Sequence, residues 1–288
     1  MVFAPFYEKF VSDIFRSNEK NIERGGEITK KFKIFKRFFA FAFVFAILRQ
    51  GALAYGGNEK IMWYYKPAEN HKQPECVGDS FDEKKDILYI GKDGSKKIYL
   101  TFDAGYGNEN VKSILDTLKK HGAKAAFFIL PGIVKNDLEL VKRMGDEGHT
   151  VCNHTSSHGD MSKIGDKSVF KKELEDCEKV YFEATGKTMT KYFRPPEGSF
   201  SLTTLRFCKE LGYTPVFWSF AYKDWDMKAQ PDAKKSLDYA LAHTHDGMVV
   251  LMHPMSKTNA LILDGLLTKW EEMGYSFGTL DELKAENC

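Results

Sequence analysis

The sequence predicts an α/β protein whose parallel β-sheet closes into a barrel. From residue 98 onward, short apolar runs alternate with amphipathic stretches in about seven strand-then-helix units, the pattern of a parallel sheet. Polar side chains capable of chemistry follow several of the expected strands, and barrel enzymes build their active sites at that carboxyl-terminal rim. No glycine-rich fingerprint follows the first strand, so dinucleotide binding is unsupported.

The individual elements follow from hydrophobic spacing and from residues that begin or end helices. Apolar runs predict strands at 98–102, 125–130, 150–154, 191–195, 214–220, 247–253 and 275–279. Helical spacing predicts helices around 111–118, 138–144, 170–181, 202–211, 237–241 and 261–270. Helix ends are indicated by Gly122, Gly148, Gly186 and Gly212, and helix starts by Ser201 and by a capping box at Thr279–Glu282.

The front of the chain resembles an export signal in composition. A basic stretch begins at Lys30, an uncharged apolar run spans Phe38–Leu48, and Ala52-Leu53-Ala54 fits an A-x-A cleavage site. We therefore assign residues 30–54 to a signal peptide, with an uncleaved membrane anchor through residues 38–48 as the alternative. Either way the mature protein is expected to be secreted or extracytoplasmic, in association with the membrane or the cell wall.

Three further segments complete the predicted organisation. Residues 1–29 form an unusual leader before a signal, and we expect the true start near Ile28. Residues 55–90 are polar and irregular, and are expected to form a strap over the main domain. The main domain itself is assigned to residues 91–285.

Composition excludes two classes of protein. The net charge of +2 is too small for the electrostatic footprint of a nucleic-acid-binding protein. The five cysteines are widely spaced and include no CxxC pair, which argues against a disulfide framework or a zinc–cysteine site.

A histidine pair is the first candidate site. In VCNHTSSHGD (151–160), His154 and His158 lie four residues apart in a turn of small polar residues, directly after an expected strand. Two imidazoles on one side of a turn suit Zn²⁺ or another borderline divalent ion. The spacing alone is weak, because a chain with eight histidines can contain such a pair by chance. Two solvated loop histidines are therefore the alternative.

Four other rim residues strengthen the metal hypothesis. Asp103 ends the first strand, where a carboxylate beside a metal can accept a proton from bound water. Arg194 precedes two prolines, which present it rigidly, and Asp224 and His253 each follow a later strand. Each of these residues has a structural alternative: a helix cap, a surface ion pair or a packed histidine. Their common position at strand ends favours one shared site.

Five phrases carry a family resemblance: TFDAG (101–105), HTSSH (154–158), RPPEG (194–198), DW (224–225) and LMH (251–253). In this order they resemble the motifs of the polysaccharide deacetylases, the carbohydrate esterase family four with its NodB homology domain. MWYYKPAENHKQP and VFWSFAYKDW look most similar to the delta-lactam-biosynthetic de-N-acetylases of spore-forming bacteria. The resemblance covers about residues 61–285. It implies a distorted (β/α) barrel with seven or eight strands.

The resemblance also implies roles for individual residues. Asp103 would be the catalytic base and His253 the general acid, while His154 and His158 would hold a divalent metal, with Zn²⁺ as the expected ion. Arg194 would brace Asp103.

Further implied roles concern support of the acid and recognition of the sugar. Asp224 would brace Arg194 or the acid, and Trp225 and Leu251 would shape the acetyl pocket. Glu197 and Tyr106 are further substrate-binding candidates. The implied reaction is de-N-acetylation of N-acetylmuramic acid in peptidoglycan glycan strands by a monomer, leading to the muramic δ-lactam of spore cortex.

Two departures from the family pattern keep other functions open. Ala104 replaces the second carboxylate that is a metal ligand in most of the family, which favours an inactive glycan-binding protein. Glu197 stands where the lactam subgroup has a basic residue. A glutamate there should repel the lactyl carboxylate, which favours N-acetylglucosamine in peptidoglycan or chitin-like oligomers.

Overall fold

The computed structural model describes residues 57–81, 84 and 86–287, which belong to one compact unit. The expected leader (1–29) and the signal or anchor segment (30–54) therefore lie outside the described residues. Within the described part, no helix combines the length and apolarity needed to cross a membrane.

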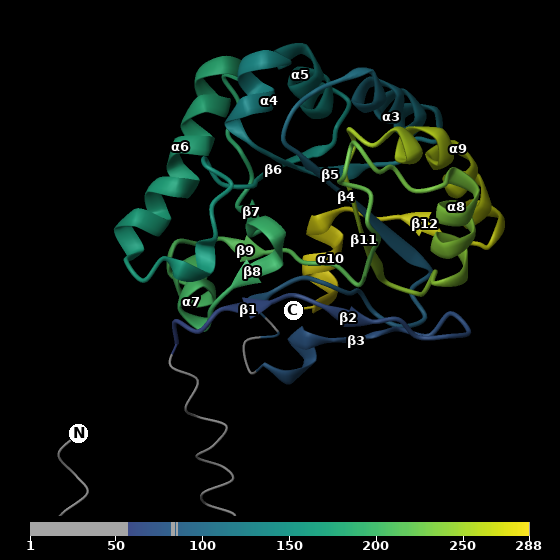
Figure 1. Cartoon of the computed structure of the whole chain (residues 1–288), viewed down its shortest axis with the longest axis horizontal. Coiled ribbons are helices and arrows are strands. Elements are labelled where there is room, and N and C mark those ends of the chain that lie inside the picture. The colour runs from purple at the N-terminus through teal and green to yellow at the C-terminus, as the bar shows by residue number, and fades with distance from the viewer. Residues whose placement is uncertain (1–56, 82–83, 85, 288) are drawn as a thin grey trace, which may run out of the picture. The chain divides into compact units, whose positions relative to one another are not determined.

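The centre of the fold is one parallel sheet that curls into a distorted barrel (Figure 1). Its strands are β4 (Lys97–Ala104), β5 (Ala125–Ile129), β6 (Thr150–Asn153), β7 (Tyr192–Phe193), β9 (Thr214–Pro215), β10 (Phe220–Ala221), β11 (Met248–Met252) and β12 (Ser276–Phe277). Every strand pair in this sheet is parallel. The predicted fold class is confirmed.

One expected strand is divided in two, and this division curls the sheet back on itself. The strand order runs β10-β11-β4-β5-β6-β7-β9, so its two ends are the two halves of residues 214–221. The first half lies beside β7 in the sheet, with Val216 N–H donating to Phe193 O at 2.8 Å. The second half lies beside β11 in the sheet, with Ser219 N–H donating to Val249 O at 3.0 Å. The sequence predicted one strand at 214–220 because a change of neighbour leaves no mark on an apolar run.

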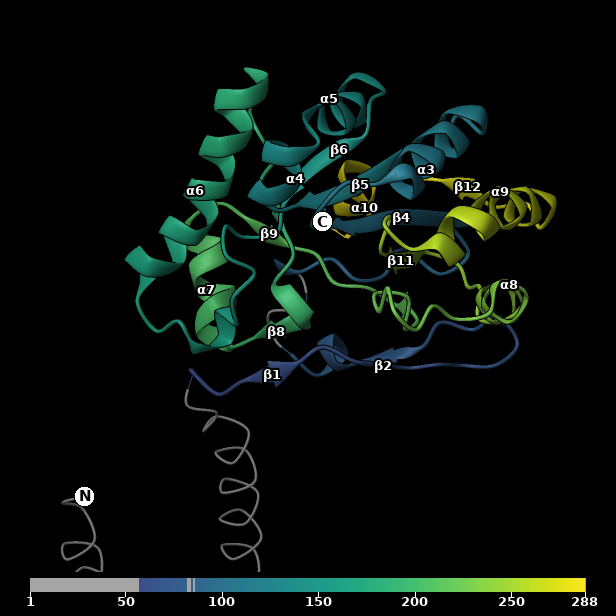
Figure 2. The same ribbon diagram turned by 45° about the horizontal axis from the view of Figure 1, so that its top comes forward.

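Helices cover the outside of the sheet in Figures 1 and 2, except for α10 (Leu280–Asn287), whose Leu280 and Leu283 pack into the core inside the barrel. The others are α3 (Glu109–Lys120), α4 (Pro131–Asn136), α5 (Leu138–Asp146), α6 (Lys167–Thr185), α7 (Leu202–Glu210), α8 (Ala233–Ala242) and α9 (Lys257–Glu272). The predicted cap at Ser201 is present, since its hydroxyl accepts from Thr204 N–H at 3.1 Å. Of these described α-helices, only α4 was not expected; it begins at Pro131 and is too short to show a helical period.

The two faces of β4 explain why its sequence reads as an unbroken apolar run. Ile98, Leu100 and Phe102 pack outward into the core beneath the helices. Tyr99 lies on the other face, in a core inside the barrel. A strand of a parallel sheet is buried on both faces, so its hydrophobic pattern does not alternate.

The strap is more ordered than its sequence suggested. It contains β1 (Ile61–Met62), β2 (Tyr65–Lys66), β3 (Glu75–Cys76) and a 3₁₀ turn at Val77–Ser80. β1 pairs antiparallel with β8 (Ser199–Phe200), and β2 pairs with β3. Trp63 of the strap packs against Phe200 and Phe217, which gives this region a separate hydrophobic core.

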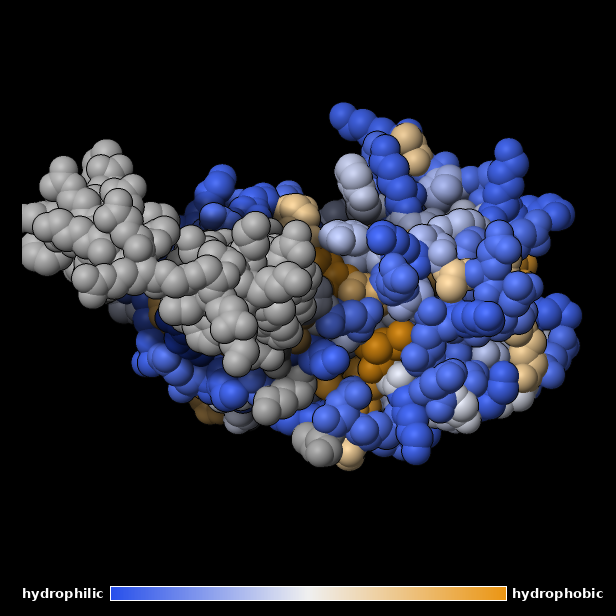
Figure 3. Space-filling model, turned by 90° about the horizontal axis from the view of Figure 1, so that it is seen from below, coloured by the Kyte–Doolittle hydropathy of each residue, from blue (hydrophilic) through white to orange (hydrophobic). Residues whose placement is uncertain are grey.

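The end of the strap also fills a gap in the barrel wall. Leu88 N–H donates to Pro215 O at 2.9 Å, and Gly91 N–H donates to Gly247 O at 2.7 Å. Residues 88–91 therefore lie between the 214–221 stretch and the start of β11. The strap forms the lower face of the molecule in Figure 1, and Figure 3 shows that face to be mostly hydrophilic, with hydrophobic residues gathered in a narrow band.

Candidate active site

The two-residue period of the strands brings the predicted residues to one mouth of the barrel. Tyr99, Cys152, Tyr192 and Val249 belong to the core inside the barrel. Side chains two or four residues further along a strand point to the same side. This rule directs Asp103, His154, Arg194 and His253 inward at the carboxyl ends of β4, β6, β7 and β11.

Asp103 and Arg194 form a buried ion pair. The Arg194 Nη1 donates to Asp103 Oδ1 at 2.7 Å, and the arginine side chain is fully buried. Burial alone would raise the pKa of Asp103, but the positive charge of Arg194 holds that pKa below its ordinary value. The carboxylate is therefore ionised and can accept a proton at neutral pH.

Arg194 is held by groups that the sequence did not reveal. Its Nη2 donates to Thr101 Oγ1 at 2.8 Å and to Phe217 O at 3.2 Å, and its Nε donates to Val216 O at 3.0 Å. The guanidinium also lies 4.2 Å from the ring centre of Phe128. Thr101 could have been found, because it precedes Asp103 by one strand period. The carbonyl partners come from a distant segment and leave no local signal.

His154 is poised as a neutral ligand. Its Nδ1 lies 2.9 Å from the carbonyl oxygen of Arg194, so this nitrogen donates and Nε2 keeps a free lone pair. Burial lowers the pKa of His154 to about 4. The Nε2 lies 3.6 Å from Asp103 Oδ2, and the ring centres of His154 and His158 are 5.0 Å apart.

The donor set fits a divalent cation held by few protein ligands. Two adjacent imidazoles, one of them neutral with a directed lone pair, suit Zn²⁺. Ala104, the last residue of β4, is fully buried and contributes no donor atom. Among the described residues, no group of three His, Cys, Asp or Glu side chains is arranged to hold a metal ion. Any cation bound here would take its remaining ligands from water or substrate.

Asp224 supports His253, one of the two partners expected for it. Asp224 Oδ1 lies 2.7 Å from His253 Nδ1, and Oδ2 accepts from the backbone N–H of His253 at 2.8 Å. Asn259 Nδ2 donates to the same Oδ2 at 2.6 Å, a contact that no sequence pattern indicated. Burial would lower the pKa of His253, but the hydrogen bond and charge of Asp224, with the charge of Asp103, raise it.

The expected substrate-binding residues differ in exposure. Trp225 is 58% exposed and Tyr106 is 43% exposed, whereas Leu251 is buried in β11. Glu197 lies in the 3₁₀ turn Pro196–Gly198 with a φ of 58°, an unusual conformation for a residue with a side chain. Glu197 is exposed, and no hydrogen bond or ion pair joins its side chain to the rest of the described chain.

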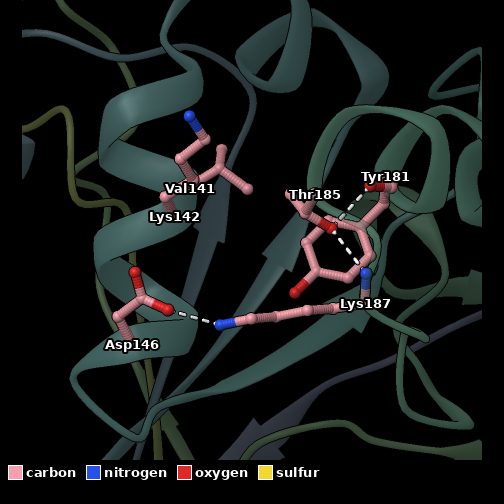
Figure 4. Close-up of a pocket in the computed structure, with 6 residues that line it drawn as sticks. All are labelled: Val141, Lys142, Asp146, Tyr181, Thr185 and Lys187. Carbon is pink, nitrogen blue, oxygen red and sulfur yellow. Dashed lines mark hydrogen bonds and ion pairs between the residues drawn. The ribbon is translucent and has the colours of Figure 1, made fainter.

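A separate pocket of about 150 Å³ lies far from these residues (Figure 4). It is lined by Val141, Lys142, Asp146, Tyr181, Thr185 and Lys187. Lys187 spans it to form an ion pair with Asp146. The pocket lies between α5 and the end of α6, with Lys187 just beyond α6, near the amino ends of the strands that follow. The pocket is thus at the opposite end of the barrel from the candidate site.

Known proteins resemble this chain in both sequence and fold. A family model described as polysaccharide deacetylase matches residues 90–216. The chain is 39% identical over 232 residues to the peptidoglycan-N-acetylmuramic acid deacetylase PdaA of Bacillus subtilis (strain 168), covering 80% of this chain and 88% of that relative. It is 38% identical over 192 residues to the peptidoglycan-N-acetylglucosamine deacetylase PgdA of Listeria monocytogenes (strain 10403S), covering 67% of this chain but 40% of that relative.

A solved structure of Bacillus subtilis PdaA, described as a family 4 carbohydrate esterase, superposes with a TM-score of 0.76 at 38% identity. The match covers 80% of this chain and 99% of that one. The chain therefore belongs to the polysaccharide deacetylase family, carbohydrate esterase family four, and is a hydrolase that acts on amide bonds.

Proposed function

We propose that this protein removes the acetyl group from N-acetylmuramic acid in peptidoglycan, outside the cytoplasmic membrane, and so leads to the muramic δ-lactam of spore cortex. The observation that carries the proposal is the meeting of an ionised Asp103 and a raised-pKa His253 at one barrel mouth. Supporting it, the 39% identity to PdaA extends over most of both chains.

The proposed chemistry divides between two proton-transfer groups. Amide hydrolysis needs a base to activate water and an acid to protonate the departing amine. Asp103, ionised beside Arg194, is suited to the first task. His253, whose pKa is raised by its contact with Asp224, is suited to the second.

Supporting groups stabilise charge and hold the substrate. A divalent metal held by His154 and His158 would polarise the acetyl carbonyl and lower the pKa of water. A backbone N–H near Glu197 is expected to help stabilise the oxyanion. Trp225, Leu251 and Tyr106 would enclose the acetyl group and the sugar.

The link to the lactam rests on ring geometry. Deacetylation frees the C2 amine of muramic acid close to the lactyl carbonyl carried on O3. Attack of that amine on the carbonyl closes a six-membered ring and expels the group that the carbonyl carried, which is water from a free lactyl acid or the amine of an attached peptide. Ring closure costs little entropy because the two groups are already held together.

The second candidate substrate is N-acetylglucosamine, in peptidoglycan or chitin-like oligomers. Glu197 favours it, because an exposed carboxylate at this mouth repels the anionic lactyl group of muramic acid but not a neutral sugar. The 38% identity to PgdA over 192 residues is consistent with this alternative.

Acetate release tests both candidates. The full chain, with and without added Zn²⁺, would be incubated with peptidoglycan, with glycan strands stripped of peptide and with chitooligomers. Acetate from muramic-acid-containing glycans alone is the expected result. Acetate from glucosamine polymers alone would support the second candidate, and no acetate from any substrate would indicate an inactive glycan-binding protein.

Two variants give this experiment its internal controls. Asp103→Asn should abolish acetate release while keeping the side-chain shape, so residual activity would point to a contaminating enzyme. Glu197→Arg should speed release from muramic glycans relative to chitooligomers, because the repulsion is replaced by attraction. An unchanged ratio of the two rates would contradict the role given to Glu197.

A further inference from the structure

The turn between the two candidate metal ligands has a strained backbone. Thr155 has a φ of 74° and His158 a φ of 57°. The left-handed region is unfavourable for residues with side chains, above all for a β-branched residue such as Thr. Conformations of this kind cost about 1–3 kcal/mol each and persist only where surrounding contacts impose them.

Some of these contacts lie within the turn itself. His158 N–H donates to Thr155 Oγ1 at 2.9 Å, and Thr155 N–H donates to Asn153 Oδ1 at 2.9 Å. Asn153 Nδ2 in turn donates to the carbonyl oxygen of Leu174 in α6, at 2.9 Å. The entry to the turn is therefore tied to α6.

One carboxylate oxygen from the same helix accepts hydrogen bonds from the middle of the turn. Glu173 Oε2 accepts from Ser156 N–H at 3.2 Å and Ser156 Oγ at 2.8 Å. It also accepts from Ser157 N–H at 3.0 Å and Ser157 Oγ at 3.0 Å. Hydrogen bonds to a charged acceptor are stronger than those between neutral groups. Four such hydrogen bonds join Glu173 Oε2 to Ser156 and Ser157, the two residues between Thr155 and His158.

We propose that Glu173 is a positioning residue for the metal site: it holds the 155–158 turn in its strained form and so sets the separation of the His154 and His158 rings. This inference rests on the proposed metal-dependent function. Glu173 lies on α6 and touches neither imidazole in the structure, so its action passes through Ser156 and Ser157. Without it the turn relaxes, and His158 leaves the position beside His154 that a shared cation requires.

The chain offers a matched control on the same helix. Glu175 is exposed and pairs with Lys171 one helical turn away, at 3.0 Å. Glu175→Ala therefore removes an identical charge from α6 without affecting the turn. Glu173→Gln is the conservative variant, since its amide oxygen can still accept hydrogen bonds but carries no charge.

Zn²⁺ affinity measured by calorimetry on the full, chelator-treated chain provides the test. Glu173→Ala should weaken Zn²⁺ binding between about 10-fold and 100-fold, the usual effect of losing a residue that orients a ligand. Glu173→Gln should fall between Glu173→Ala and the unmodified chain, and Glu175→Ala should bind as the unmodified chain does. Unmodified affinity in Glu173→Ala overturns the inference.

A metal-free measurement separates this inference from the function on which it rests. The ring-proton NMR signals of His154 and His158 should shift in Glu173→Ala and not in Glu175→Ala. If the unmodified chain binds no Zn²⁺, the metal-dependent function fails, and these signals alone decide the role of Glu173. Unshifted signals in Glu173→Ala would then reject it.

Discussion

Asp224 holds His253 at two points, with one carboxylate oxygen 2.7 Å from the ring Nδ1 and the other accepting the backbone N–H at 2.8 Å. The double contact fixes both the position of the ring and the nitrogen that carries its shared proton. Nε2 is left as the atom that can serve a substrate. This arrangement predicts a pH effect that distinguishes Asp224 from a merely structural residue.

Asp224→Asn should move the alkaline limb of the pH profile of deacetylation to lower pH. Asp224 raises the pKa of His253, so its loss lowers that pKa, and the acid form disappears at a lower pH. At neutral pH kcat should fall at least about tenfold, because general acid catalysis contributes roughly 10²–10⁴. A profile of kcat against pH measures this, and an alkaline limb that stays in place would show that His253 is not the acid.

Ala104→Asp should tighten Zn²⁺ binding and, without metal, destabilise the fold. The position is fully buried at the end of β4, where an unpaired carboxylate is costly. Thermal unfolding with and without Zn²⁺ should show a lower Tm for the metal-free variant and a larger rise on metal addition than in the unmodified chain. Equal rises would mean that a carboxylate at 104 does not reach the cation.

Trp225→Ala should raise KM for glycan by up to about tenfold, with a smaller change in kcat, if the exposed ring stacks on sugar. Phe182 is a suitable control, because it is 55% exposed but lies on α6, distant from the mouth. Phe182→Ala should leave KM unchanged. Equal effects of the two substitutions on KM would contradict the role of Trp225 in substrate binding.

His245 should make the fold sensitive to acid. It is buried between Ser219 Oγ and the carbonyl oxygen of His243, each at 2.9 Å, and burial lowers its pKa to about 4. The unfolded chain takes up this proton near pH 6.5, so stability falls as pH drops from about 6.5 to 4, by about 3 kcal/mol. Below that range the contribution is constant, because both states are protonated.

Urea unfolding at several pH values tests the contribution of His245. The stability of His245→Asn should fall less steeply between pH 6.5 and 4 than that of the unmodified chain, whatever the difference between the two at pH 8. Parallel curves across this range would assign the acid sensitivity to other groups.

The sequence predicted the barrel and the residues of its mouth for the same reason. Apolar runs and strand ends are local features, and parallel strands carry their carboxyl ends to one edge. The rest depends on contacts between distant segments. Neither the change of neighbour within 214–221 nor the four bonds to Glu173 appear in any local pattern. Asn259 was missed likewise, since a single polar residue on a helix has no distinguishing spacing.

The strap is synthesised before the strands that it contacts, and this order affects folding. Leu88 and Gly91 emerge from the ribosome long before the carbonyl groups of Pro215 and Gly247 to which they bind. The wall of the barrel stays open until Gly247 has been synthesised, and such long sequence separations slow folding. A recombinant protein that begins beyond residue 91 would lack the segment that closes the barrel wall. It should aggregate instead of forming an active domain.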